Sequence, residues 1–135
     1  MARRPKKRIL LVEDDFYILD IYQTKLAQEG YKVLIAEDGE VALDIVQREK
    51  GKIDLILLDI SMPHVNGLEF IKKVRADKDH AEIPFLVLTN LVKQSLVEEF
   101  KALGSLDYIV KANYTPRQVM AKIKAYIRGE AEEAA

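Results

Sequence analysis

A short run of four apolar residues, Leu55–Leu58, constrains the fold of this chain more than any other stretch. The run does not alternate between polar and apolar residues, which is typical of a strand buried on both faces of a parallel sheet. Asp59 follows it directly, and Pro63 and Asn66-Gly67 then favour a turn away from the sheet. Open parallel sheets bind their ligands at the carboxyl ends of their strands. Asp59 is therefore a candidate site residue, although a carboxylate in this position could also simply cap the strand.

Strand-like and helix-like segments alternate along the chain. Short apolar runs predict five strands, and apolar positions at i, i+3 and i+4 spacing predict five helices. The predicted strands cover residues 9–12, 31–36, 55–58, 85–88 and 107–110. The predicted helices cover residues 16–29, 39–50, 67–75, 93–103 and 116–128. This alternation is typical of a doubly wound α/β fold, in which right-handed crossovers join the strands of a parallel sheet.

Capping signals place the ends of several helices. Side chains that can accept a hydrogen bond from a helix N-terminus occur at Asp38, Asn66, Ser95 and Thr115. The last three each stand three residues before a Glu or Gln, which is the spacing of a capping box. Because the box at Ser95 lies inside the predicted 93–103 helix, the start of that helix stays open. Helix-ending glycines occur at Gly30, Gly51 and Gly104.

Length, charge and composition exclude several classes of protein. The chain has 135 residues, a net charge of −1 and no cysteine, which predicts one domain without disulfides or a Cys-bound metal. The near-neutral charge gives no reason to expect a nucleic-acid partner. No apolar run approaches the roughly 20 residues that span a bilayer. We therefore expect no membrane association and a cytoplasmic location.

Composition changes only at the two ends of the chain. We expect a basic tail over residues 1–6, one folded domain over residues 7–128 and an acidic tail over residues 129–135, with no output domain. The basic residues could form an arm for nucleic acid or an anionic membrane, but a solvated tail is the favoured interpretation. His64 and His80 fall in polar connections, and we expect both to be exposed to solvent.

Polar side chains follow four of the five predicted strands: Glu13 and Asp14, Asp59, Thr89, and Lys111. Because the carboxyl ends of parallel strands meet at one edge of a sheet, we expect these side chains to lie close together. Three neighbouring carboxylates repel one another, and a bound cation removes that conflict. A small set of hard oxygen ligands suits Mg²⁺, which binds proteins through one or two carboxylates. The sequence therefore predicts a site for Mg²⁺, or for Mn²⁺, at this edge.

The same set of residues fits phosphoryl transfer. An Asp carboxylate can attack phosphorus and carry an aspartyl-phosphate. A metal ion and a Lys ammonium neutralise charge on the phosphoryl oxygens, and a Thr hydroxyl can donate a hydrogen bond to one of them. We therefore predict that Asp59 is the nucleophile and that Lys111 and Thr89 contact the phosphoryl group. A metal-dependent phosphohydrolase is a weaker alternative, because it would need an acid where Ser61 stands.

Four motifs resemble the response-regulator receiver domain: V-E-D-D at 12–15, L-L-D-I-S-M-P-H-V-N-G at 57–67, L-T at 88–89 and D-Y-I-V-K at 107–111. The resemblance covers residues 7–128 and implies a flavodoxin-like three-layer sandwich with the strand order 2-1-3-4-5. It implies that Asp59 is the phosphoacceptor and that Lys111 contacts the phosphoryl group. The metal ligands that it implies are Glu13, Asp14, Asp59 and the backbone carbonyl of Ser61.

The resemblance also implies partners and a switch. Members of this family take a phosphoryl group from a phosphohistidine of a sensor histidine kinase or a phosphotransfer protein, and they are signalling proteins rather than enzymes. Thr89 and Tyr108 match the switch pair, which changes the face formed by the fourth helix, the fifth strand and the fifth helix. We expect that face to regulate a separate effector protein, with the chain a monomer or a weak phosphorylation-dependent homodimer. A phosphorylation-independent interaction module is the alternative.

Two positions depart from the family pattern. The family usually has a proline after the lysine, often with a cis peptide bond, and here that residue is Ala112. A cis bond before another residue costs about 2.5–4 kcal/mol, so the backbone is trans or its neighbours retain the strain. Asn90 follows Thr89 where the family mostly has a small residue. We expect the larger side chain to alter dephosphorylation without preventing phosphorylation.

Overall fold

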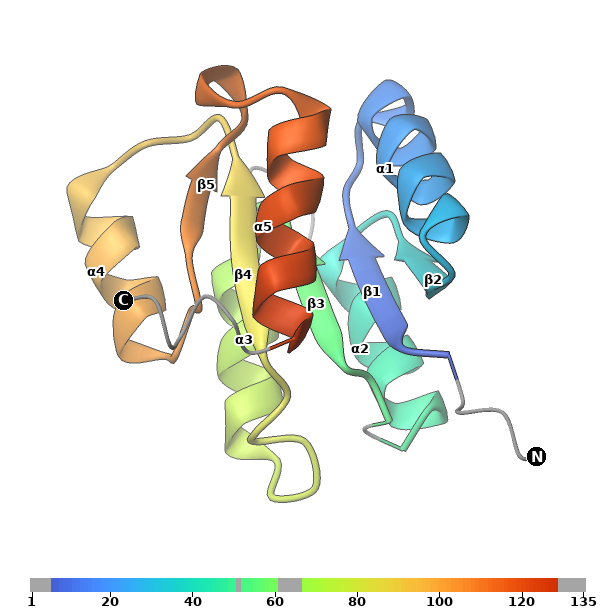
Figure 1. Ribbon diagram of the computed structural model, residues 1–135. Helices are drawn as coiled ribbons and strands as arrows, with labels where there is room; N and C mark the ends of the chain where they lie inside the picture. Colours follow the sequence, from blue (N-terminus) through green and yellow to red (C-terminus); the bar gives the residue numbers. More distant parts are fainter. Residues whose placement is uncertain (1–5, 51, 61–66, 129–135) are drawn as a thin grey trace.

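A five-stranded parallel sheet forms the centre of the computed structural model, which describes residues 6–50, 52–60 and 67–128 (Figure 1). The strands are β1 (Arg8–Val12), β2 (Lys32–Ala36), β3 (Leu55–Leu58), β4 (Phe85–Thr89) and β5 (Tyr108–Val110). Their order in the sheet is β2-β1-β3-β4-β5. The helices are α1 (Phe16–Gln28), α2 (Gly39–Arg48), α3 (Gly67–Ala76), α4 (Gln94–Ala102) and α5 (Pro116–Arg128), with a 3₁₀ turn, η1 (Lys111–Asn113), before α5. The predicted fold class and strand order are confirmed.

Helices cover both faces of the sheet, which explains the unbroken apolar run in β3. Ile56 and Leu58 belong to a core cluster with residues of α2, α3 and α4. Leu55 and Leu57 belong to a second cluster with residues of α1 and α5. All four side chains are at most 1% exposed. The result is the three-layer sandwich that Figure 1 shows, with α1 and α5 on the near side of the sheet.

Two of the predicted caps form as the sequence indicated. The Asp38 carboxylate accepts a hydrogen bond from the N–H of Val41 at 2.9 Å, at the start of α2. At the start of α5, Thr115 Oγ1 accepts from the N–H of Gln118 at 3.2 Å. Gln118 Oε1 accepts in turn from the N–H of Thr115 at 2.8 Å. This reciprocal pair is a capping box, so the entry to α5 is fixed by local hydrogen bonds.

Two of the predicted helix ends are also confirmed. Gly30 and Gly104 have φ angles of +89° and +94°, which is the left-handed conformation that favours glycine. The α2 helix ends at Arg48, two residues earlier than predicted, and Lys50 takes a left-handed φ of +53°. The predicted stop at Gly51 and the predicted cap at Asn66 lie outside the described residues.

The start of α4, which the sequence left open, does not use the capping box at Ser95. The helix begins at Gln94, and Lys93 is its N-cap residue without a side-chain hydrogen bond. The Lys93 carbonyl accepts the N–H groups of Leu96 and Val97 at 2.9 and 3.0 Å. Ser95 therefore lies within the first helical turn, because the N-cap is two residues earlier, at Lys93.

The prediction that His80 is exposed to solvent is wrong. Its side chain is buried, and its backbone N–H donates to the Asp77 carbonyl at 3.0 Å. After this turn, His80 lines a pocket together with Gln47 and Lys50, at the carboxyl end of α2. Within the described part of the chain, His80 Nδ1 has no hydrogen-bond partner. The exposure of His80 was misjudged because the connection between α3 and β4 is polar in sequence, yet it folds back against the end of α2. His64 lies outside the described residues.

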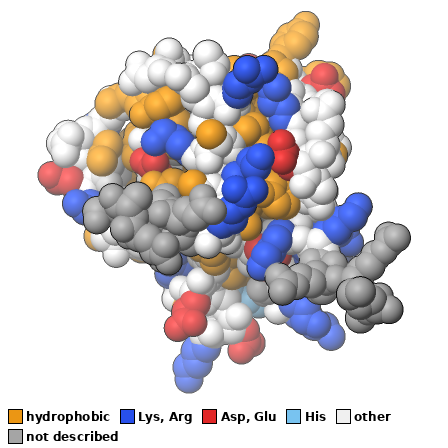
Figure 2. Space-filling view, viewed as in Figure 1, with side chains coloured by type: hydrophobic (Ala, Val, Ile, Leu, Met, Phe, Trp, Pro, Cys, Tyr) orange, Lys and Arg blue, Asp and Glu red, His pale blue; other side chains and the backbone are white. Residues whose placement is uncertain are grey.

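The outer surface mixes basic and apolar side chains. On the face that includes α5, Lys and Arg side chains lie among hydrophobic ones (Figure 2). Among the described residues, no helix has both the length and the apolar character that crossing a membrane requires.

Candidate functional site

Two buried carboxylates follow neighbouring strands at the carboxyl edge of the sheet. Glu13 follows β1, and its N–H donates to the Ala36 carbonyl of β2 at 3.0 Å. Asp59 follows β3, and its N–H donates to the Val12 carbonyl of β1 at 2.9 Å. These bonds extend the parallel ladder by one residue on each strand. The sheet therefore fixes both backbones, and the side chains of Glu13 and Asp59 are only 2% and 5% exposed.

A third carboxylate completes an acidic cluster. One carboxylate oxygen each from Glu13, Asp14 and Asp59 lies within 4.8 Å of the others, and Asp14 is exposed to solvent. Burial, together with the neighbouring Asp59, raises the pKa of Glu13 from its usual 4.5 to about 8, against the opposing effect of Lys111. Oxygen donors at this spacing fit a hard divalent cation such as Mg²⁺, whose charge would relieve their mutual repulsion. Ser61, the other predicted ligand, lies outside the described residues.

Lys111 carries the positive charge of the site. It is the first residue of η1, which follows β5 directly, and its side chain is only 10% exposed. The ammonium forms a short ion pair with Glu13 Oε1 and lies 3.3 Å from Asp59 Oδ2. The Lys111 ammonium thus bridges carboxylates that follow two different strands. The sequence predicted that these side chains lie close together at the carboxyl edge of the sheet.

Thr89 is the last residue of β4 and is fully buried. Its hydroxyl donates a hydrogen bond to Asp59 Oδ1 at 2.9 Å. The Thr89 hydroxyl oxygen also accepts a hydrogen bond from the N–H of Leu91 at 3.2 Å. Thr89 therefore contacts the candidate phosphoacceptor on one side and the connection between β4 and α4 on the other.

Tyr108 is connected to Asp59 indirectly, through Leu91 and Thr89. Its hydroxyl donates a short hydrogen bond to the Leu91 carbonyl, and its ring centroid is 6.5 Å from that of Phe100 in α4. Burial, with a smaller effect from the charge of Asp59, raises the pKa of Tyr108 above its usual value. Leu91 is therefore bonded to both predicted switch residues, through its N–H to Thr89 and through its carbonyl to Tyr108.

Comparison with known proteins identifies the family. Residues 9–124 match the response regulator receiver domain. The chain belongs to this family. Its relatives include the alkaline phosphatase synthesis transcriptional regulatory protein PhoP of Bacillus subtilis, which is 39% identical over 127 residues, covering 90% of this chain and 49% of the relative. A probable transcriptional regulator of Guillardia theta, ycf27, is 35% identical over 123 residues, covering 91% of this chain and 46% of the relative.

Solved receiver structures have the same architecture. A CheY-like receiver domain protein from Methanospirillum hungatei superimposes with a TM-score of 0.83 at 29% identity, covering 96% of this chain and 99% of that one. The chemotaxis protein CheY4 of Vibrio cholerae gives a TM-score of 0.79 at 30% identity, covering 89% and 98%. The receiver fold therefore accounts for nearly all of this chain, whereas the chain spans about half the length of the curated relatives it matches.

Sequence reasoning missed the role of Asp15 in this receiver domain. Asp15 Oδ1 accepts hydrogen bonds from the N–H groups of Tyr17 and Ile18 at 2.9 and 3.2 Å. The third acid of the E-D-D motif is thus the N-cap of α1 and is separate from the acidic cluster. Its position directly before the predicted helix start was the signal that could have identified it.

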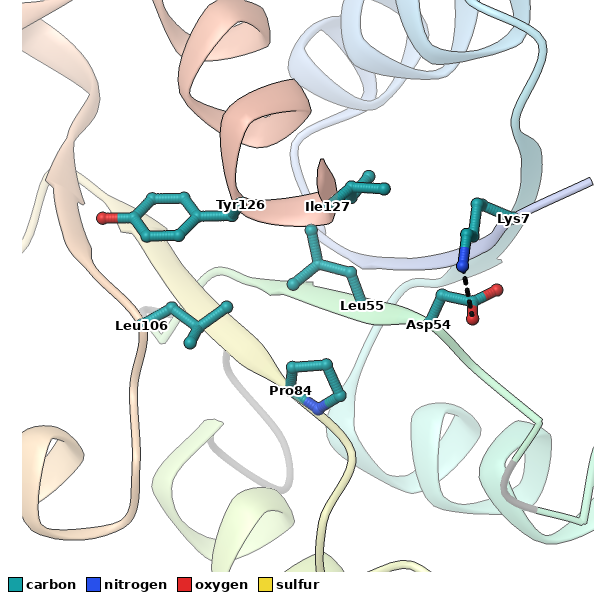
Figure 3. Close-up of a pocket in the computed structure, with 7 residues that line it drawn as sticks. All are labelled: Lys7, Asp54, Leu55, Pro84, Leu106, Tyr126 and Ile127. Atoms are coloured by element: carbon teal, nitrogen blue, oxygen red, sulfur yellow. Dashed lines mark ion pairs between the residues drawn. The ribbon is translucent and has the colours of Figure 1, made fainter. Parts of the chain in front are cut away.

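A separate cavity of about 170 Å³ lies at the opposite end of the sheet (Figure 3). Leu55, Pro84 and Leu106, at the beginnings of β3, β4 and β5, line it together with residues of α5. The ion pair between Lys7 and Asp54, 3.9 Å long, lies at one side. Because the cavity is at the amino ends of the strands, it does not belong to the site around Asp59.

Proposed function

We propose that this receiver domain is a phosphorylation-activated switch whose phosphoacceptor is Asp59. The observation that carries the proposal is the pair of contacts on that carboxylate. Thr89 donates to Oδ1 at 2.9 Å, and the Lys111 ammonium lies 3.3 Å from Oδ2. A hydroxyl and an ammonium placed this way can both interact with phosphoryl oxygens on a modified Asp59, which is the stabilisation that phosphoryl transfer requires.

The phosphoryl donor in this proposal is a phosphohistidine of a sensor histidine kinase or a phosphotransfer protein. An Asp59 carboxylate oxygen attacks the phosphorus, so a P–O bond forms while the P–N bond to the donor imidazole breaks. The departing nitrogen keeps the electron pair of that bond, and the donor leaves as a neutral imidazole when its other nitrogen carries a proton. Asp59 must be ionised to attack, and the Lys111 charge favours that form.

The acidic cluster is the proposed site for Mg²⁺, with Mn²⁺ as the alternative. Glu13, Asp14 and Asp59 would hold the ion through their carboxylates, and the backbone carbonyl of Ser61 is a further proposed ligand. When bound there, the ion supplies positive charge beside the incoming phosphoryl oxygens. Removing Asp14, the exposed member, is expected to weaken Mg²⁺ binding without removing a buried group.

In the proposed switch, the backbone hydrogen bonds of Leu91 couple Thr89 to Tyr108. In the unmodified protein Thr89 bonds both Asp59 and the Leu91 N–H, so a phosphoryl group that draws the Thr89 hydroxyl inward competes with the bond to Leu91. Tyr108 bonds the carbonyl of the same residue. A change at Asp59 therefore biases the conformation of the β4–α4 connection and of the face formed by α4, β5 and α5.

That face is the proposed contact for a separate downstream effector protein. Between α4 and β5 it has a groove lined by residues that include Val97, Lys101 and Tyr108, a mixture of basic and apolar side chains that suits recognition of another protein. We propose a cytoplasmic protein that is monomeric or forms a weak homodimer on phosphorylation. A phosphorylation-independent interaction module would use the same face without the modification.

An NMR titration tests this proposal. Beryllofluoride, which mimics a phosphoryl group on a carboxylate, is expected to shift the amide signals of Leu91 and Tyr108 when Mg²⁺ is present. Asp59→Asn should abolish the shifts, whereas Asp44→Asn, which removes an exposed carboxylate of α2, should leave them unchanged. Equal shifts in Asp59→Asn would exclude Asp59 as the acceptor. Absence of shifts in the unsubstituted protein would favour the phosphorylation-independent module.

A further inference from the structure

The two residues that depart from the family pattern contact each other. Asn90 Oδ1 accepts a hydrogen bond from the backbone N–H of Ala112 at 2.9 Å. Both residues are exposed, and they are 22 positions apart in the sequence. A proline at position 112 has no N–H to donate, and a small apolar residue at position 90 has no acceptor. Each departure therefore supplies the group that the other needs. The described residues contain no cis peptide bond, so the backbone before Ala112 is trans.

This hydrogen bond joins the two backbone segments that carry the groups facing Asp59. Thr89 pairs with Val110 as the last rung between β4 and β5, and Asn90 and Ala112 lie just beyond that rung. Thr89 contacts Asp59 from one segment, and Lys111 contacts it from the other. The side-chain carbonyl of Asn90 thus continues the pairing between the two strands where the backbone ladder has ended.

The bond also ties the connection after β4 to the turn after Lys111. Its carbonyl oxygen is engaged by the segment after Lys111, and its neighbour Leu91 is bonded to Thr89 and Tyr108. The connection after β4 is therefore attached at three points, and one of them is the turn that begins with Lys111.

We propose that Asn90 is a positioning residue, which holds the turn after Lys111 so that the ammonium stays beside Asp59. This inference rests on the proposed phosphorylation of Asp59. Because Asn90 acts through Lys111, whose ammonium faces Asp59, its loss should lower the maximal rate of phosphorylation. Loss of one hydrogen bond of this kind is expected to slow phosphorylation about three- to tenfold.

Variants of matched shape separate hydrogen bonding from bulk. Asn90→Leu keeps the branched shape but has no acceptor, Asn90→Ala removes both, and Ala112→Pro removes the donor. With acetyl phosphate as the donor, each variant should show a lower maximal rate of adduct formation. The half-saturating concentration of acetyl phosphate should stay unchanged. Asn90→Leu combined with Ala112→Pro should be no slower than the slower single variant, because both remove one bond.

Hydrogen exchange tests the contact itself. The Ala112 amide should be protected in the unsubstituted protein and should exchange faster in Asn90→Leu and Asn90→Ala. A normal phosphorylation rate in Asn90→Leu, with an altered rate only in Asn90→Ala, would overturn the proposal and show that Asn90 acts through its size. Unchanged phosphorylation rates in every variant would overturn the proposed role of Asn90 but not the proposed phosphorylation of Asp59. No adduct in the unsubstituted protein would overturn both this role and the proposed phosphorylation.

Discussion

Replacing Thr89 with valine removes one hydroxyl from the site and keeps the shape of the side chain. Thr89 is fully buried, and its hydroxyl makes two of the contacts at the carboxyl edge of the sheet. It donates to the Asp59 carboxylate at 2.9 Å and accepts from the Leu91 N–H at 3.2 Å. In Thr89→Val both bonds are lost, and a methyl group lies against a buried carboxylate.

The expected cost follows from the chemistry of the two bonds. A hydrogen bond to a charged group contributes about 1.5–3 kcal/mol, and one to a backbone N–H about 0.5–1.5 kcal/mol. The buried methyl group of valine offsets about 0.8 kcal/mol of this loss. We therefore expect Thr89→Val to lower the free energy of unfolding by about 1–4 kcal/mol in the absence of metal and phosphodonor.

Urea denaturation of the metal-free protein measures this change. The unfolding midpoint should fall by about 1 M for a loss of 2 kcal/mol and an m-value near 2 kcal/mol/M. Repeating the substitution in Asp59→Asn provides the control, because the carboxylate is then absent and Thr89→Val should cost less. An equal cost in both backgrounds, or a valine variant as stable as the parent, would refute the view that the hydroxyl stabilises the Asp59 carboxylate.

Three further predictions follow from other contacts. A Cβ on Gly67 would lie 2.9 Å from Ile60 Cγ2 and 3.1 Å from Ile60 Cα, so Gly67→Ala should lower the unfolding free energy in urea by about 1–3 kcal/mol. Arg75 donates to two backbone carbonyls, both at 2.8 Å, and Arg75→Lys should lose at least one of these bonds and about 1.5–3 kcal/mol in the same assay. Burial and the hydrogen bond to Asp107 raise the pKa of Tyr126 from 10.0 to about 12. Its stabilising contribution should be present below pH 10 and lost as the pH rises through 12, and an ultraviolet titration should lose its highest-pKa tyrosine in Tyr126→Phe.

Each of these predictions has a result that contradicts it. A Gly67→Ala protein of unchanged stability would mean that the backbone of Ile60 yields to the added methyl group. An Arg75→Lys protein of full stability would mean that a single ammonium replaces both guanidinium bonds. A tyrosine titration that is unchanged in Tyr126→Phe would assign the raised pKa to another side chain.

The sheet and its edge were predictable because they depend on residues that signal their place locally. The apolar run of β3 and the glycines after α1 and α4 specified the alternation of elements, and the strand ends then brought Glu13, Asp59 and Lys111 together. The strand order came from the family resemblance, because no local signal in the chain states which strands are neighbours.

Two other contacts between distant residues could not be predicted, because they depend on the path of the connections between strands and helices. The burial of His80 depends on how the polar connection before β4 folds back against α2, and no local pattern encodes that path. The bond from Ala112 to Asn90 depends on how β4 and β5 end, so the two departures looked independent in the sequence. The start of α4 stayed open in the sequence because the capping box at Ser95 lies inside the predicted helix; the structure begins the helix at Gln94, with Lys93 as its N-cap.

The most direct test of the central claim is the intact mass of the protein after incubation with acetyl phosphate. With Mg²⁺ present we expect the addition of one phosphoryl group, located at Asp59 by peptide mapping. The addition should disappear when Mg²⁺ is chelated and in Asp59→Asn, and it should persist in the surface control Asp44→Asn. An Asp59→Asn protein that gains the phosphoryl group as fully as the parent, or a parent that gains none, would contradict the claim that Asp59 is the phosphoacceptor of a Mg²⁺-dependent switch.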